Sequence, residues 1–127
     1  MDKKNQSSED TNEVLTAEEE MLRKAEQLVL DNLDEPEFSV HDLAAHLAYS
    51  LRQIERLLKK HTGLTPNAFI REIRLQKAYK IIEQKRFTTI KEVCYEVGMS
   101  NPAYFTTKFK ERFGKNPSEI VESAYLL

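Results

Sequence analysis

The sequence predicts an all-α fold of seven helices, in which a long linker helix joins two helix-turn-helix subdomains. Capping boxes, in which Ser or Thr stands three residues before Glu, Gln or Asp, recur before apolar runs at helical spacing. Three Gly and no Trp leave little to suggest a sheet. A near-repeat of about fifty residues relates two pairs of short helices. We expect helices near 17–33, 39–47, 51–62, 66–84, 90–97, 102–113 and 117–124.

The two ends of the chain differ in charge. Residues 1–37 hold four Lys/Arg and twelve Asp/Glu, a net charge of −8, whereas residues 38–127 hold fifteen and nine, a net charge of +6. A basic core behind an acidic leader suits a nucleic-acid-binding protein, although basic domains also occur without nucleic acid. No run of 18 apolar residues is present, and the N-terminus is polar. We therefore expect a cytoplasmic protein without a transmembrane helix or signal peptide.

The chain divides into a leader and one helical domain. Residues 1–15 are polar and lack periodicity, so we expect a disordered leader, a tag remnant or the end of a linker. The domain, residues 16–127, begins at the capping box of Thr16 and Glu19. Its first helix carries apolar residues at helical spacing and ends in an acidic stretch before Pro36.

The first helix-turn-helix unit is expected at about residues 39–62. Ser39 and Asp42 form the capping box of its first helix. Ser50 and Gln53 form that of its second helix, which stops at a Gly. Two short helices joined by a tight turn are the architecture that places a recognition helix in the DNA major groove.

A linker helix at about residues 66–84 separates this unit from a second one at about 89–114. A Pro at the first helical position is favourable, and it follows the N-cap of the linker helix and of the second recognition helix. A Gly ends each helix of the second unit, because Gly tolerates positive φ. In chain order, these caps and stops are Thr65, Thr89, Gly98, Asn101 and Gly114.

The near-repeat makes the paired units far more specific than either unit alone. The apolar positions Val40, Leu43, Ala44 and Leu47 match Ile90, Val93, Cys94 and Val97, fifty residues later. Beyond the turn, Ile54, Leu58, Lys59, Gly63 and Pro66 match Phe105, Phe109, Lys110, Gly114 and Pro117 at an offset of fifty-one.

Several strings carry a family resemblance: S-V-H-D-L-A-A-H-L from Ser39, F-I-R-E-I-R-L-Q-K-A from Phe69, V-G-M-S-N-P-A-Y-F-T-T-K-F-K-E-R-F-G from Val97, and F-G-K-N-P-S-E from Phe113. Residues from about 20 to 123 thereby resemble the DNA-binding domain of the AraC-type transcription regulators. The resemblance implies that two recognition helices enter successive major-groove turns on one face of double-stranded DNA. It also implies sequence-specific regulation of bacterial transcription, often activation through contact with RNA polymerase.

Ala48 departs from the repeat, because its counterpart in the second unit is Gly98. If Ala48 adopts positive φ, the first turn carries about 1–2 kcal/mol of strain. A displaced first turn would move Arg52 away from the floor of the major groove.

Catalysis and metal binding find little support in the sequence. His41, His46 and His61 lack metal-ligand spacing, and neither a phosphate-binding Gly loop nor a nucleophile elbow is present. Cys94 lies in an apolar stripe, where a small core residue is favoured over a redox or ligand role. We expect no catalytic residue, no metal and no cofactor.

The outward face of the first recognition helix is the main candidate for reading bases. Arg52 and Arg56 lie one turn apart, and each can donate two hydrogen bonds to guanine O6 and N7. Glu55 can accept from cytosine N4 or orient an Arg. The alternative is a solvated charged face of the kind that any surface helix has.

The second recognition helix presents shorter or neutral side chains that suit thymine-methyl contact, phosphate contact or loose readout. Tyr104 suits a half-buried packing role equally well. The base-contact candidates on this helix are Ala103, Tyr104, Thr106 and Thr107. The phosphate candidates on both helices, which also read as helix caps or solubilising charges, are Ser50, Gln53, Lys59, Lys60, Asn101, Lys108 and Lys110.

Two functions remain open. The first is a sequence-specific DNA-binding regulator, either stand-alone or the output domain of a larger sensor-regulator such as a two-component protein. The second is a protein-interaction module with weak DNA affinity that contacts polymerase or an antagonist; the acidic first helix gives it some support. No membrane partner is expected, and oligomerisation is expected to use a domain outside this chain.

Overall fold

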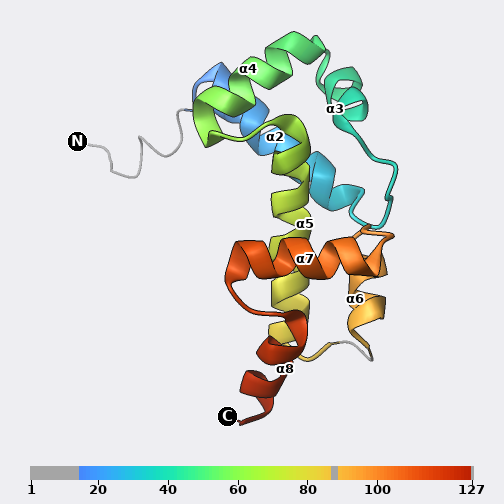
Figure 1. Ribbon diagram of the computed structural model, residues 1–127. Helices are drawn as coiled ribbons and strands as arrows, with labels where there is room; N and C mark the ends of the chain where they lie inside the picture. Colours follow the sequence, from blue (N-terminus) through green and yellow to red (C-terminus); the bar gives the residue numbers. More distant parts are fainter. Residues whose placement is uncertain (1–14, 87–88, 127) are drawn as a thin grey trace, which may run out of the picture.

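The computed structural model describes residues 15–86 and 89–126, with side chains described as far as residue 121. Within these residues the chain forms α-helices and no β-strand (Figure 1). The helices are α2 (Ala17–Asp31), α3 (Val40–Leu47), α4 (Leu51–Thr62), α5 (Pro66–Glu83), α6 (Ile90–Glu96), α7 (Pro102–Phe113) and α8 (Pro117–Leu126). The predicted all-α fold is confirmed, and each helix end lies within two residues of its expected position. The expected disorder of residues 1–15 falls almost wholly outside the described residues.

The predicted caps explain why the helices start where they do. Reciprocal capping boxes are present at Thr16, Ser39 and Ser50, each with the side chain three residues on returning a hydrogen bond. Thr65 and Asn101 cap α5 and α7, and each is followed by Pro at the first helical position. The start sites are therefore encoded locally, by side chains that satisfy otherwise unpaired backbone N–H groups.

Helix α5 runs through the middle of the molecule and belongs to two hydrophobic cores (Figure 1). Its first half contributes Phe69, Ile70 and Ile73 to a core shared with α2, α3 and α4. Its second half contributes residues from Leu75 onward to a core shared with α6, α7 and α8. Because the two cores lie on different sides of α5, its buried residues are spread around the helix instead of forming one stripe.

The second core is built around aromatic residues. Phe105 and Phe109 are fully buried, like Ile54 and Leu58, their counterparts in the near-repeat. Phe109 packs with Phe105, Phe113 and Tyr79 at ring-centroid distances of 5.7, 4.8 and 6.1 Å. Cys94 is also fully buried in this core, where its thiol donates to the carbonyl O of Met99, and burial raises the pKa of the thiol. The expected core role of Cys94 is confirmed.

Arg74 lies on α5 where the helix passes from one core to the other. It is 5% exposed, and no salt bridge within the described residues neutralises its charge. Its Nη1 donates to the carbonyl oxygens of Leu33 and Val97, at 2.5 and 2.6 Å, and its Nη2 donates to that of Glu35 at 2.9 Å. Burial lowers the pKa of the guanidinium. One side chain thus ties α5 to the α2–α3 loop and to the end of α6.

The turns of the two helix-turn-helix units share a hydrogen-bond pattern. Ala48 has φ 58° and ψ 40°, and the following N–H, that of Tyr49, donates to the carbonyl O of Ala44 at 3.0 Å. Gly98 has φ 79°, and Met99 N–H donates to the carbonyl O of Cys94 at 2.9 Å. Ala48 therefore accepts the left-handed conformation that its Gly counterpart adopts freely, and the first turn keeps this pattern despite the strain.

Ala48→Gly is expected to increase the free energy of unfolding by about 0.5–1 kcal/mol. The substitution relieves the strain of the left-handed conformation. Part of this gain is offset because Gly loses more conformational entropy than Ala on folding. Ala48 is exposed, so its methyl group contributes little packing. Urea denaturation monitored by circular dichroism measures the change. A variant no more stable than the wild type would contradict strain at this turn.

Gly98→Ala is expected to destabilise the domain by about 3 kcal/mol, and Gly63→Ala by only about 1 kcal/mol. Both glycines have positive φ, of 79° and 77°. A Cβ on Gly63 would meet no atom of the described residues within 4 Å, whereas a Cβ on Gly98 would lie 1.7 Å from Nη1 of Arg74 and 2.2 Å from the carbonyl O of Leu33. Equal losses in chemical denaturation would show that Gly98 matters only for its φ.

Candidate nucleic-acid interface

Helices α4 and α7 are presented in the same way on the two halves of the molecule. Each follows a tight turn, and both run in the same direction, from right to left in Figure 1, with α5 behind α7. Each has 12 residues and ends at a Gly in the left-handed conformation. The structure therefore repeats one helix-turn-helix arrangement, as the sequence near-repeat indicated.

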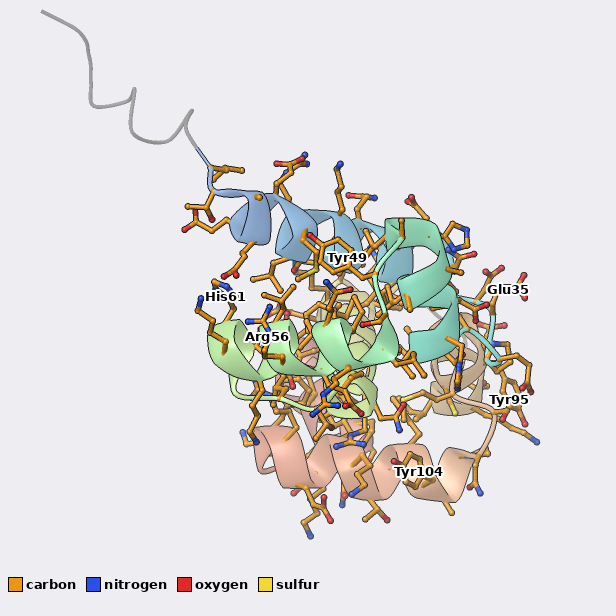
Figure 2. All side chains as sticks on the ribbon, turned by 90° about the horizontal axis from the view of Figure 1, so that it is seen from above. Glu35, Tyr49, Arg56, His61, Tyr95 and Tyr104 are labelled. Atoms are coloured by element: carbon orange, nitrogen blue, oxygen red, sulfur yellow. The ribbon has the colours of Figure 1, made fainter. Side chains whose placement is uncertain are left out.

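Helix α4 separates its apolar and charged residues cleanly. Ile54, Leu57 and Leu58 are 0%, 2% and 0% exposed and fill the first core. Arg52, Glu55 and Arg56, the base-contact candidates, are all exposed, and Figure 2 shows Arg56 on the face of α4 turned toward the viewer. The two guanidinium groups form no salt bridge within the described residues. They are free to donate to a ligand.

The C-terminal end of α4 is fastened to α2. Glu18 Oε1 accepts from Lys60 Nζ at 2.8 Å and lies 2.9 Å from His61 Nε2. Hydrogen bonds from Lys60 and His61 lower the pKa of Glu18 to about 2. Lys60, a phosphate candidate, therefore already has an anionic partner on the protein, which distinguishes it from the exposed Lys59.

Helix α7 places its candidates less uniformly. Ala103 and Thr107 are exposed, Thr106 is half-buried, and Tyr104 is 45% exposed. Tyr104 is labelled on α7 in Figure 2. Its hydroxyl accepts from Nη1 of Arg71 at 3.3 Å, and Lys108 Nζ lies 5.6 Å from the centre of its ring. Tyr104 therefore combines a fixed orientation with an accessible ring.

Polar contacts from two adjacent residues of α5 hold α7 near both ends. Arg71 reaches Tyr104 in the first turn, and Glu72 accepts from Nε of Arg112 in the last turn, at 2.8 and 2.9 Å. Partial burial acts to raise the pKa of Glu72, but hydrogen bonds from Arg112 and Gln76 lower it overall. Sequence reasoning missed Arg71, Glu72 and Arg112, because the contacts span 33 and 40 residues and follow no local pattern.

The remaining phosphate candidates fall into two groups. The side-chain oxygens of Ser50, Gln53 and Asn101 accept from backbone N–H groups in helix caps, which leaves the amide nitrogens of the latter two available to donate. Lys110 is exposed, whereas Lys108 donates to Glu111 at 3.3 Å. Among the described residues, no ion pair therefore engages the ammonium groups of two candidates, Lys59 and Lys110.

Metal binding and membrane insertion find no support in the described part of the chain. Those residues include no group of three or more His, Cys, Asp or Glu that could hold a metal ion. His46 Nδ1 lies 2.8 Å from the carbonyl O of Asp42, and His61 pairs with Glu18. None of the described helices has the length and apolar character needed to cross a membrane.

Comparison with known proteins gives consistent matches. A family model described as a helix-turn-helix domain matches residues 43–123. The chain is 33% identical over 106 residues to Histidine kinase P4 of Formosa agariphila, a match that covers 84% of this chain and 8% of that protein. It is 35% identical over 78 residues to the HTH-type transcriptional activator RhaS of Escherichia fergusonii, covering 61% of this chain and 28% of the relative. The chain therefore spans only a small part of either relative.

A solved structure extends the likeness to the whole fold. The chain is similar to a transcriptional regulator from Chromobacterium violaceum that contains an AraC-type DNA-binding domain, with a TM-score of 0.77 and 28% identity. The match covers 83% of this chain and 92% of that one.

Glu18→Gln is expected to flatten the dependence of stability on acid pH. A carboxylate whose pKa falls from 4.5 to about 2 on folding stabilises the native state above pH 4.5, and this contribution is lost as pH falls toward 2. The wild type should therefore lose stability over that range and the variant should lose less. Thermal melts between pH 6 and pH 2.5 test this, with Glu26→Gln, an exposed position on α2 outside the capping box, as the control. Parallel curves for Glu18→Gln and wild type would contradict the contact.

Proposed function

The chain belongs to the AraC-type family of helix-turn-helix DNA-binding domains, and we propose that it reads DNA sequence mainly through α4 and docks mainly through α7. A domain of this family is the DNA-binding part of a transcription regulator and not an enzyme. Its partner is double-stranded DNA, which in a bacterium lies in the cytoplasm. The unequal division of work between the two helices is the part that goes beyond the family.

The chemistry of the outward side chains supports this division. Arg52 and Arg56 are exposed and one turn apart on α4, and neither forms a salt bridge with a described residue. Their counterparts on α7 are Ala103 and Thr107. A bidentate Arg–guanine pair discriminates between bases by about 1–3 kcal/mol, whereas a methyl or hydroxyl contact has less to lose. The single observation that carries the proposal is therefore the pair of free guanidinium groups on α4 alone.

Docking by α7 rests on groups that contact the backbone of DNA. Asn101 caps its N-terminus and keeps an amide nitrogen free, and Lys110 extends into solvent. Thr106 and Tyr104 add a hydroxyl and an aromatic ring. Contacts of this kind position a protein on the duplex without reporting which bases are present.

We infer further that the domain serves as the output module of a larger sensor-regulator and activates transcription, with RNA polymerase as a second partner. Two similarities support this inference: one relative is named a histidine kinase and another a transcriptional activator. The chain matches only 8% of the first relative's length, so sensing, signal transfer and oligomerisation would lie elsewhere in such a protein.

A protein-interaction function for the domain is the second candidate, and α2 favours it. The first turn of α2 carries three acidic residues, and its last turn carries no basic one. An acidic helix can contact a basic protein partner, and it would repel DNA. Steep salt dependence of DNA binding separates the two candidates, since each phosphate that the protein neutralises releases counterions.

Arg56→Ala is expected to weaken binding to a selected DNA site by about 1–3 kcal/mol and to relax preference at one or two base pairs. Non-specific affinity should hardly change. Fluorescence anisotropy on the selected site and on a scrambled duplex measures both effects. The proposed division fails if Thr106→Ala or Thr107→Ala relaxes base preference more than Arg52→Ala and Arg56→Ala do.

Lys110→Ala is expected to weaken binding to selected and scrambled DNA alike, because a phosphate contact carries no base information. The slope of log affinity against log salt should fall by about one. Anisotropy titrations between low and moderate salt give this slope. A loss confined to the selected site would assign Lys110 to base reading instead, and wild-type affinity independent of salt would favour the protein-interaction function.

A further inference from the structure

A cavity of about 550 Å³ lies at the junction of the two helix-turn-helix units. Its walls are residues 36–39 of the α2–α3 loop, the first half of α5, the α6–α7 turn at residues 98–101, and Tyr104. The loop and the turn approach each other beside α5 in Figure 1, and Arg74 joins them by hydrogen bonds. We name this space the junction cavity.

The charge of the junction cavity is unbalanced. Two guanidinium groups line it, those of Arg71 and Arg74, against one carboxylate, that of Glu37. Arg74 is 5% exposed and contacts only neutral carbonyl oxygens, while the hydrogen bond of Arg71 goes to the neutral hydroxyl of Tyr104. Neither forms a salt bridge within the described residues. A buried positive charge without a nearby counter-charge creates a local potential that attracts an anion.

Further donors lie around the two guanidinium groups. Asn67 and Ser100 are exposed at the cavity wall, and the amide nitrogen of Asn101 is not used by its capping bond. Asn101 also marks the N-terminus of the 12-residue α7, where the helix dipole favours negative charge. The wall therefore combines cationic and neutral donors of the kind that surround an oxyanion.

We propose that the junction cavity holds one phosphodiester group of the DNA backbone, between the two major-groove turns that α4 and α7 enter. This proposal rests on the proposed function. A DNA strand that joins successive turns must pass between the two recognition helices. Their N-termini lie on the same side of the molecule as the α2–α3 loop and the α6–α7 turn, which line the cavity (Figure 1). The cavity is open to solvent, which suits a group that continues as a chain in both directions.

In this arrangement Arg71 contacts the phosphate and Arg74 supplies the field behind it. Arg71 is half-buried, and its hydrogen bond to Tyr104 leaves other guanidinium N–H groups to donate. Because the cavity walls come from both units, a phosphate bound there contacts both. This contact therefore forms only when the two units are correctly spaced on the DNA. The contact would contribute affinity without base preference.

A methylphosphonate scan tests the proposal. Single neutral methylphosphonates are placed in turn along the backbone between the two half-sites of a selected DNA, and the affinity of wild type and Arg71→Gln is measured for each. One position should weaken wild-type binding by about tenfold and have little further effect on Arg71→Gln. Tyr104→Phe, which removes the hydroxyl partner but keeps the guanidinium, should retain the wild-type sensitivity at that position.

The matched control is Arg86→Gln, which removes the same charge just beyond the C-terminal end of α5, outside the cavity. It should lose no sensitivity at any scanned position. The proposal is overturned if Arg71→Gln keeps the full wild-type penalty at every position. Binding of free inorganic phosphate is followed by NMR shifts of the Ser100 and Asn101 amides. The proposal is also overturned if Arg71→Gln weakens this phosphate binding but leaves DNA binding unchanged. Failure of wild type to bind unmodified DNA would instead reject the proposed function itself.

Discussion

The buried guanidinium of Arg74 is the interaction on which the arrangement of the two helix-turn-helix units depends. Each unit has its own core, and α5 contributes a different face to each. Arg74 lies between these cores and donates to carbonyl groups from both sides of the junction. A buried charge is costly unless its donors are satisfied, so the two segments that supply the acceptors are held at a fixed separation. Gly98 is required by the same arrangement, because any side chain at this position would displace the guanidinium of Arg74.

This junction matters for the proposed function because successive major-groove turns on one face of DNA lie about 34–36 Å apart. Two recognition helices can read them together only if the linker between the units is rigid. The secondary anchors differ: α4 is tied to α2 through Glu18, whereas α7 is tied to α5 through Arg71 and Glu72. A change at the start of α2 would therefore reach the first recognition helix without disturbing the second.

Local chemistry made most of the fold predictable, because N-caps and left-handed stops act over three or four residues. The strained conformation of Ala48 also followed from its place in the near-repeat. The spread of buried residues around α5 followed no single stripe, because a helix shared by two cores buries more than one face. Arg74 and Arg71 were not predicted as contacts, because their partners lie 23 to 41 residues away and are mostly backbone carbonyls. The base-contact assignments on α4 and α7 stay predictions.

If Arg74 fixes the spacing of the two units, its removal should change how the domain responds to the spacing of half-sites on DNA. The measurement is the ratio of affinities for a selected site and for the same site with about five base pairs, half a helical turn, inserted between its half-sites. The wild-type domain should strongly prefer the original spacing. Arg74→Met, which keeps the volume but removes the hydrogen bonds, should bind the two DNAs with nearly equal affinity. An Arg74→Met domain that keeps the wild-type ratio would contradict the claim.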